Sequence, residues 1–405
     1  MCGFAWEPKG TVRARAFPLA AEVVSRGHEV TIFVTPYDNP SESRKEDVLE
    51  GVRILNIAVD PVPRLVQAPL LVKRLCRAIQ SYSPDVVHVF KPKGYAGAAC
   101  TWLLMKGFGG LVLDCDDWEG WGGWNEVKGY PWIIKEYIDR QEKWLIRRVP
   151  AITTASRILE RRAIELRGSS RNVYYVPNCG ASRKGVTMCE SALSSAGLVA
   201  KGSFGLPDGP VIFYGGHFEV ADDVMFFCRA AEHAARRSGA TIVLVGEGPQ
   251  LADVKKFFAQ REGMVVRFFP RLPYEQFLRL IAASDVAAFP YPDTPIYRAK
   301  CSARIVDYMS MAKAVVTTAI GQNTDYIVDG ESGVLVPPGD EARFAQALER
   351  LLQDPGLRVR LGQNAKQRIK EKFSWGGVPV DNCLAAYQQL SDRDFENRGS
   401  HPVLC

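Results

Sequence analysis

Long apolar runs are missing from this 405-residue sequence. No stretch approaches the roughly 18 consecutive apolar residues that a bilayer-spanning helix needs, so no transmembrane segment is predicted. The first residues also lack the pattern of a secretory leader, in which Lys or Arg precedes an apolar run. We therefore expect a cytoplasmic protein.

Paired cysteines and clustered histidines are also absent. The ten cysteines are scattered with no C-x-x-C pair, and the five histidines are dispersed. This pattern argues against a disulfide framework and against a zinc site. We expect reduced thiols, no bound metal and no cofactor.

Positive charge is in small excess, since 51 basic and 45 acidic residues leave a net charge of +6. That excess fits a polyanionic small ligand or an anionic membrane surface, and it is too diffuse to indicate nucleic acid. The sequence is 47% hydrophobic and 24% charged, which is ordinary for a globular protein. At about 150 residues per domain, the length predicts two or three domains.

Short β-branched runs alternate with longer helical patterns, as is typical of parallel sheets flanked by helices. The predicted strands are 29–34, 52–57, 85–90, 111–115, 151–154, 173–176, 211–214, 241–245, 264–268, 285–289, 314–317 and 333–336. Residues 179–210 lack a clear period and end in the turn signal GLPDGP, so we predict a linker there. The expected fold class is α/β, with two Rossmann-like doubly wound domains, 1–178 and 211–375, facing each other across a cleft.

Two helices are predicted from their apolar spacing. The apolar residues of 341–353 recur at i, i+3, i+4, i+7 and i+8, and Asp340 is placed to cap this helix. In the first half, Ile134, Tyr137 and Leu145 belong to an apolar stripe that we expect on one face of a helix.

Polar or glycine residues follow three strands of the second half. These residues are Gly215, Gly216 and His217 after the first strand, Gly246, Glu247, Gly248 and Pro249 after the second, and Arg298, Lys300 and Ser302 before a helix with Asp307. Glycines there let a ligand approach the backbone, and helix N-termini attract phosphate. The alternative for each glycine is a tight turn. A dinucleotide fingerprint is rejected, because Pro249 follows the second glycine and Leu251 replaces the third.

The run VIFYGG…VLVGEGP…ESGVLVPPGD…FSW within 211–375 resembles the donor-binding domain of glycosyltransferase family 4. VPNC at 176–179 resembles the motif that closes the family's first domain, and 376–405 resembles its helix that crosses back to that domain. The resemblance implies a GT-B fold and transfer of a sugar from a nucleoside diphosphate sugar, with retention and without metal. The diphosphate would lie on the glycine loops and a helix N-terminus, and a carboxylate would bind the ribose hydroxyls.

The sequence departs from the family at its donor residues. The family's two glutamates fall on Ala299 and Asp307, and its diphosphate-binding Arg and Lys fall near Gly216 and Ala221. We expect Arg298, Lys300 and Arg304 to supply the missing positive charge, the alternative being a solvated basic loop.

On the acceptor side, Asp116 stands where many family members carry a histidine, and Asp117 follows it. Asp116 could orient or help to deprotonate an acceptor hydroxyl, or simply cap a turn. His88 is interpreted as a hydrogen-bonded strand residue. The family's opening strand and glycine loop correspond to MCGFAWEPKG, which starts inside that strand. We therefore expect a truncated first strand and a short or missing sheet centre, with Lys9, Gly10 and Arg13 on the acceptor side.

Five of the eight tryptophans fall within 118–144, among lysines and arginines. Trp118 and its two loop neighbours could stack on an acceptor sugar, contact a membrane surface or pack in the core. For Trp132 and Trp144 we expect core packing.

The sequence thus predicts a glycosyltransferase of cell-envelope polysaccharide biosynthesis. Its partners would be a nucleotide sugar and a glycan or lipid-linked acceptor, with peripheral contact to the cytoplasmic membrane face. The alternatives are a catalytically weak nucleotide-sugar or glycan-binding relative and a nucleotide-sugar epimerase.

Overall fold

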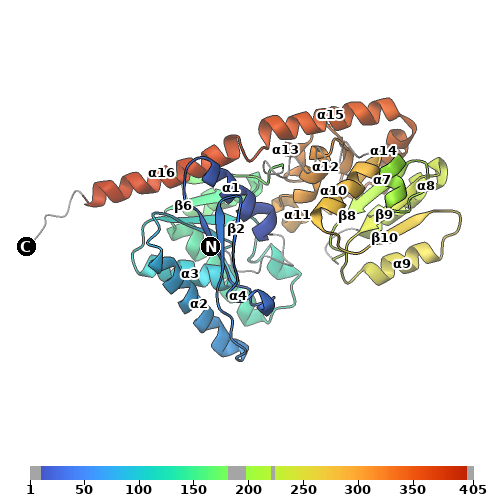
Figure 1. Ribbon diagram of the computed structural model, residues 1–405. Coiled ribbons are helices and arrows are strands. Elements are labelled where there is room, and N and C mark those ends of the chain that lie inside the picture. The colour runs from blue at the N-terminus through green and yellow to red at the C-terminus, as the bar shows by residue number, and fades with distance from the viewer. Residues whose placement is uncertain (1–10, 181–197, 220–223, 399–405) are drawn as a thin grey trace, which may run out of the picture. The chain divides into compact units, whose positions relative to one another are not determined.

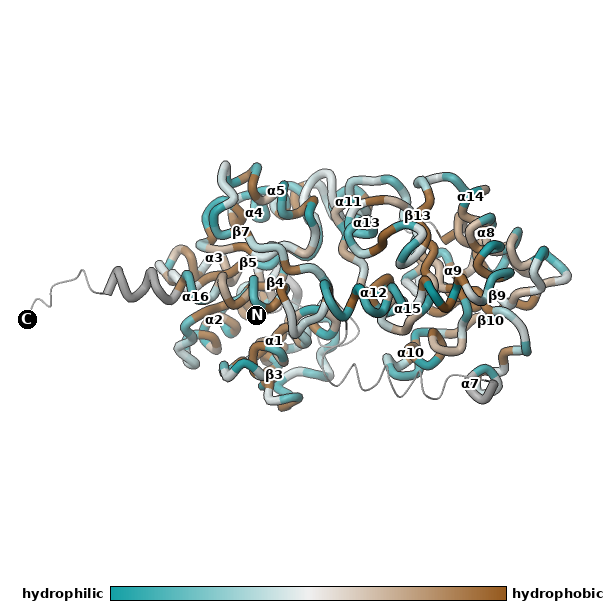
Figure 2. Tube along the Cα trace, turned by 90° about the horizontal axis from the view of Figure 1, so that it is seen from above, coloured by the Kyte–Doolittle hydropathy of each residue, from teal (hydrophilic) through white to brown (hydrophobic). Residues whose placement is uncertain are grey.

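The computed structural model describes residues 11–180, 198–219 and 224–398, and it divides into two compact units (Figure 1). The first comprises Met1–Asn178, Ala299–Cys301 and Trp375–Cys405, and the second Cys179–Arg298 and Ser302–Ser374. In Figure 2 the hydrophobic colour gathers inside each unit, around β4 and β5 in the first and around β9 and β10 in the second. Among the described residues, no helix has the length and hydropathy that crossing a bilayer requires.

The described strands of the first unit form two sheets. One has the order β1 (Thr31–Val34), β3 (Val52–Asn56) and β2 (Glu46–Leu49), and the other is the parallel series β4 (Val87–Phe90), β5 (Leu111–Cys115), β6 (Ala151–Thr154) and β7 (Val173–Tyr175). Strand β2 pairs antiparallel with β3 and was not predicted, because its sequence, EDVL, lacks an apolar alternation. The expected truncated first strand falls on residues 1–10, which lie outside the described residues.

Helices cover the strands of the first unit. They are α1 (Phe17–Ser25), α2 (Arg64–Ser81), α3 (Gly94–Met105), α4 (Trp132–Arg148), α5 (Arg157–Arg167) and α16 (Val378–Arg398), with short helical turns η1 (Val12–Ala16), η2 (Pro40–Glu42) and η3 (Trp124–Glu126). The C-terminal helix α16 packs on β6 and β7, where its Ala386 and Leu390 are buried with Val112 and Ala151. Contact with these apolar strands ties the end of the chain to the first unit.

All neighbouring strands of the second unit are parallel. The sheet order is β10 (Val266–Phe269), β9 (Thr241–Val245), β8 (Val211–Gly215), β11 (Val286–Phe289), β12 (Ala314–Thr318) and β13 (Val334–Val336). Its helices are α7 (Leu198–Ser203), α8 (Val224–Ser238), α9 (Leu251–Ala259), α10 (Tyr274–Ala283), α11 (Pro295–Ala299), α12 (Ala303–Ser310), α13 (Asn323–Tyr326), α14 (Glu341–Gln353) and α15 (Pro355–Lys372). Four central strands are fully buried, as expected for a sheet covered on both faces.

The predicted helix 341–353 is confirmed as α14, and the Asp340 side chain accepts a hydrogen bond from the Arg343 amide at its start. The predicted linker contains a short helix, α7, while 181–197 lie outside the described residues. Two Rossmann-like units, in which every described strand pair except β2–β3 is parallel, confirm the predicted α/β fold class.

Candidate functional site

Five charged side chains meet where β4 and β5 end. Lys91 and Lys93 follow β4, and Asp116, Asp117 and Glu119 follow β5. The two strands are parallel neighbours, so their carboxyl ends lie at the same edge of the sheet. Sequence-distant residues are therefore brought together at this edge.

The Lys91 ammonium contacts all three carboxylates. Its Nζ lies 3.1 Å from Asp116 Oδ1, 2.5 Å from Asp117 Oδ2 and 3.3 Å from Glu119 Oε1. Burial disfavours the charge, but the carboxylates outweigh it and raise the pKa of Lys91 well above its usual value. Lys91 also has a φ of 73°, a rare conformation for a residue with a side chain. The backbone strain is consistent with a position fixed by these ion pairs.

The two neighbouring aspartates have opposite pKa shifts. Burial raises the pKa of Asp116 to about 7, assisted by the charges of Asp117 and Asp114 and opposed by Lys91. Burial also acts on Asp117, but Lys91 and a hydrogen bond from Trp124 outweigh it and lower the pKa of that carboxyl. Although Asp116 Oδ1 is buried and near the ammonium, it receives no hydrogen bond of acceptable geometry from any residue in the described ranges. Such a pair suits different roles in acid–base chemistry.

Asp116, Asp117 and Glu119 lie close enough to share a metal ion, with carboxylate oxygens within 4.8 Å of one another. Lys91 contacts the oxygens of all three, and Lys93 forms a second ion pair with Glu119. Two ammonium groups thus already offset most of the negative charge that would attract a cation.

A buried polar network lies beside this cluster. Arg15, from η1, donates through Nε and Nη2 to the two oxygens of Asp114 at 2.7 and 2.6 Å. Thr153 also donates to Asp114, at 2.6 Å. His88 Nε2 lies 3.0 Å from the Thr153 hydroxyl, and its Nδ1 lies 2.8 Å from the Tyr387 hydroxyl on α16. The interpretation of His88 as a hydrogen-bonded strand residue is confirmed.

The residues predicted to lie on the acceptor side differ from one another in their exposure. Trp118 is half-buried, with the Arg162 guanidinium 4.4 Å from its ring centroid and its buried indole Nε1 without a hydrogen-bond partner among the described residues. Arg13 is exposed on η1, while Lys9 and Gly10 lie outside the described residues. The expectation that Trp132 packs in the core is wrong, since its side chain is 68% exposed. Trp132 is the first residue of α4, and the buried face of that helix begins only at Ile138.

The glycines predicted to bind the donor lie in two touching loops of the second unit. The Phe218 amide donates to the Glu247 carbonyl at 2.9 Å. Gly246 has a φ of 138°, and a Cβ there would overlap the Gly216 carbonyl oxygen. Gly248 has a φ of 151°, and a Cβ there would lie 2.6 Å from the Phe218 carbonyl oxygen. Loop packing thus requires both glycines regardless of any ligand.

The polar residues of these loops are exposed, and α12 lies beside the end of β8. His217, Glu247 and Pro249 are exposed. The Tyr308 hydroxyl accepts from the Gly215 amide at 2.9 Å and donates to the Gly215 carbonyl at 3.1 Å, which ties α12 to the strand end.

Asp307 lies on α12, whose N-cap is Ser302. The Tyr274 hydroxyl donates to Asp307 Oδ1 at 2.9 Å, and Arg304 lies 3.5 Å from Oδ2. Burial raises the pKa of Asp307, although Arg304 and Tyr274 act in the opposite direction. Asp307 is thus a partly accessible carboxylate held in place at the helix.

The three cations expected to replace the missing phosphate ligands each have their own partner. Arg298 donates to both oxygens of Asp293, at 2.6 and 2.9 Å. Arg304 pairs with Asp307 and covers the Phe277 ring. Lys300, which belongs to the first unit, lies 5.8 Å from the Trp124 ring centroid. Each of the three side chains thus has a different partner, and Ala221 lies outside the described residues.

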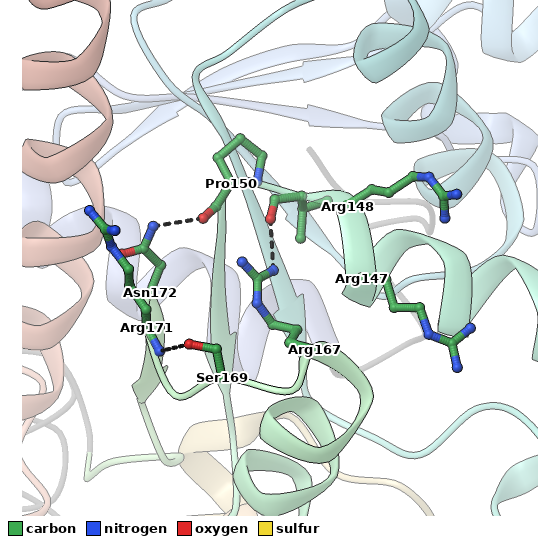
Figure 3. Close-up of a pocket in the computed structure, with 8 residues that line it drawn as sticks. Arg147, Arg148, Pro150, Arg167, Ser169, Arg171 and Asn172 are labelled. Atoms are coloured by element: carbon green, nitrogen blue, oxygen red, sulfur yellow. Dashed lines mark hydrogen bonds between the residues drawn. The ribbon is translucent and has the colours of Figure 1, made fainter.

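A hollow of about 380 Å³ lies at the opposite edge of the first unit's sheet, before β6 and β7. Four arginines line it, namely Arg147, Arg148, Arg167 and Arg171. Figure 3 shows Arg147 and Arg148 extending away from Arg171, and Arg167 donates to the Ile146 and Val149 carbonyls at 3.0 and 2.8 Å. Because these guanidinium groups do not converge, the hollow does not form an anion site.

Each unit matches a family of known proteins. The profile described as "Glycosyl transferase 4-like domain" matches residues 10–179, and "Glycosyl transferases group 1" matches 209–354. The structure is similar to sucrose-phosphate synthase from Thermosynechococcus elongatus, with a TM-score of 0.72 and 19% identity, covering 99% of this chain and 96% of that one. It is also similar to Anabaena HepE in complex with UDP and glucose, with a TM-score of 0.69 and 15% identity, covering 98% and 99% of the two chains.

These similarities identify the fold as that of the GT-B glycosyltransferases. The chain is also 28% identical over 193 residues to the alpha-D-kanosaminyltransferase of Streptomyces kanamyceticus. This match covers 46% of this chain and 47%, or about half, of that relative's length. The chain belongs to the group 1 glycosyltransferases, family 4, and is an enzyme of the transferase class.

Sequence reasoning missed Lys91, Lys93, Glu119 and Arg15. A signal was available for the lysines, because Lys91-Pro92-Lys93 directly follows predicted strand 85–90. No comparable sequence signal links Arg15 to Asp114, which is 99 residues away.

Proposed function

We propose that this glycosyltransferase uses a nucleoside diphosphate sugar and presents its acceptor hydroxyl to Asp116. The observation that carries the proposal is the pair of adjacent aspartates in contact with one buried lysine, in which Asp116 Oδ1 is buried and receives no hydrogen bond from the described residues. Asp116 can accept a hydrogen bond from a hydroxyl when it is ionised. The ion pair between Lys91 and Asp117 holds the side chains beside Asp116 in position. Such a pair could orient an acceptor.

The donor is assigned to the second unit. Glycine backbone at the ends of β8 and β9 would approach the diphosphate, and Asp307 would accept hydrogen bonds from the ribose hydroxyls. The similarity to HepE, which has been solved with UDP and glucose, supports a nucleotide sugar. Arg304 already neutralises part of the Asp307 charge, so donor binding must compete for that ion pair.

In the proposed reaction, the acceptor oxygen forms a bond to the anomeric carbon while the bond from that carbon to the phosphate oxygen breaks. The hydroxyl proton passes to the leaving diphosphate on the same face, so retention is proposed. Asp116 holds the hydroxyl in position throughout. No metal is assigned a step.

Donor binding and transfer can be tested separately. Thermal shifts with UDP-, GDP- and ADP-sugars identify the donor, and transfer or donor hydrolysis is then measured. Asp307→Ala should abolish the donor-induced shift. Asp116→Asn should keep that shift and lose most of the transfer activity. Full transfer activity in Asp116→Asn would contradict the assignment, and interconversion of the free donor without acceptor would indicate an epimerase.

A further inference from the structure

Exposed apolar side chains are concentrated at the start of α4. Among the described residues, fourteen large hydrophobic side chains are exposed, and six of them fall between 127 and 137. We call these six the α4 patch: Val127 (49%), Tyr130 (40%), Trp132 (68%), Ile133 (70%), Ile134 (43%) and Tyr137 (50%). The other eight are isolated along the chain, as is normal for a protein surface. A concentration of this kind marks an interaction surface.

The patch surrounds the tip of the helix. Trp132, Ile133 and Ile134 are consecutive, and successive helical residues are about 100° apart, so their side chains point to different sides of the first turn. The side of α4 that packs on the unit begins only at Ile138. A folded partner or a second copy would cover one side of such a tip. A lipid interface can surround it.

The charges beside the patch suit an anionic surface. The Lys128 ammonium lies 5.0 Å from the Trp124 ring centroid, and the Lys135 ammonium lies 5.7 Å from that of Trp121. Two carboxylates lie beside these lysines, and both have hydrogen-bond partners. Glu126 accepts from the Gly122 amide at 2.9 Å, and Glu136 accepts from Trp121 Nε1 at 3.1 Å and from Arg140 at 2.7 Å. Aromatic and aliphatic side chains next to lysines are the composition of interfacial membrane anchors.

We infer that the α4 patch docks the first unit on an anionic lipid surface, with Trp132 and Ile133 inserted and Lys128 and Lys135 at headgroup level. The docking does not depend on the reaction. That it would hold the enzyme beside a lipid-linked acceptor rests on the proposed function.

The full chain can be tested by co-sedimentation with vesicles. Vesicles of equal parts phosphatidylglycerol and phosphatidylcholine should bind it, and pure phosphatidylcholine should bind it more weakly. Trp132→Ser/Ile133→Ser should weaken binding to the anionic vesicles roughly 10- to 100-fold, since inserting one large apolar side chain can account for about a decade or more. Lys128→Gln/Lys135→Gln should reduce only the preference for anionic vesicles.

Met105→Ser/Val359→Ser is the matched control, because both side chains are exposed but isolated at 77% and 63%. This variant should bind vesicles as the unmodified chain does. Equal losses of vesicle binding in Trp132→Ser/Ile133→Ser and in Met105→Ser/Val359→Ser would overturn the inference. A chain that dimerises through the patch and does not bind vesicles would also overturn it. Melting temperatures exclude unfolding as the cause of either result.

The two proposals fail in different ways. If Trp132→Ser/Ile133→Ser keeps transfer to a water-soluble acceptor and vesicle binding is absent even in the unmodified chain, docking is refuted and the proposed function stands. If vesicles bind through the patch and no nucleotide sugar is used, docking is supported and the proposed function fails.

Discussion

Replacing Lys91 by methionine should strongly destabilise the first unit. The change keeps most of the apolar side-chain volume and removes the ammonium that contacts Asp116, Asp117 and Glu119. At the 3.1 Å separation from Asp116, the attraction is about 5 kcal/mol for an effective dielectric constant near 20. Desolvation of the buried ammonium offsets part of this. Breaking one side of a buried ion pair lowers the free energy of unfolding by about 3–5 kcal/mol, which is the loss we expect near pH 8.

The free energy of unfolding that Lys91→Met loses should be smaller in acid. Without the ammonium, burial is no longer opposed by Lys91, and the folded-state pKa values of the Asp116 and Asp117 carboxyl groups rise above their unfolded values. The folded variant then binds more protons than the unfolded chain, so its stability increases as the pH falls through those raised values. The difference between variant and unmodified protein should therefore be smaller at pH 5 than at pH 8.

Urea unfolding followed by tryptophan fluorescence measures this, because all eight tryptophans belong to the first unit. Lys45→Met, which breaks an exposed pair with Glu42, is the control and should change stability by less than about 1 kcal/mol. Adding Asp116→Asn to Lys91→Met should restore part of the loss. A loss below about 1 kcal/mol, or an equal loss at both pH values, would refute the reasoning.

Three further expectations follow from single sites. Transfer activity should rise with pH through about 7, where Asp116 becomes ionised, and Asp116→Asn should flatten this profile. Burial lowers the pKa of His88 to about 3, so stability should fall by at most about 5 kcal/mol as the pH drops from 6.5 toward 3, and acid titration of His88→Asn should lack this contribution. Gly246→Ala should cost about 3 kcal/mol in chemical denaturation, because of its positive φ and the Gly216 carbonyl, whereas Gly339→Ala, with a positive φ and open space, should cost about 1 kcal/mol.

The sequence by itself determined the elements whose signals are local. Helix α14 and its Asp340 cap follow from apolar spacing and a short polar side chain, and the buried parallel strands follow from β-branched runs. Strand β2 has no such signal, because an exposed antiparallel strand gains its identity from its partner β3. Family motifs identified the class of enzyme, since they lie within continuous stretches of the chain.

Tertiary structure decided which charges meet and which apolar residues remain outside. Asp116 and Asp117 were recognised from the sequence, but Lys91 reaches them only because β4 and β5 are adjacent. The basic residues before α12 could be counted from the sequence, whereas their separate partners could not. Helical spacing predicted an apolar stripe on one face of α4, yet the first turn of the helix extends beyond the surface on which α4 packs. Periodicity shows which residues share a face, but burial depends on what the rest of the chain places against that face.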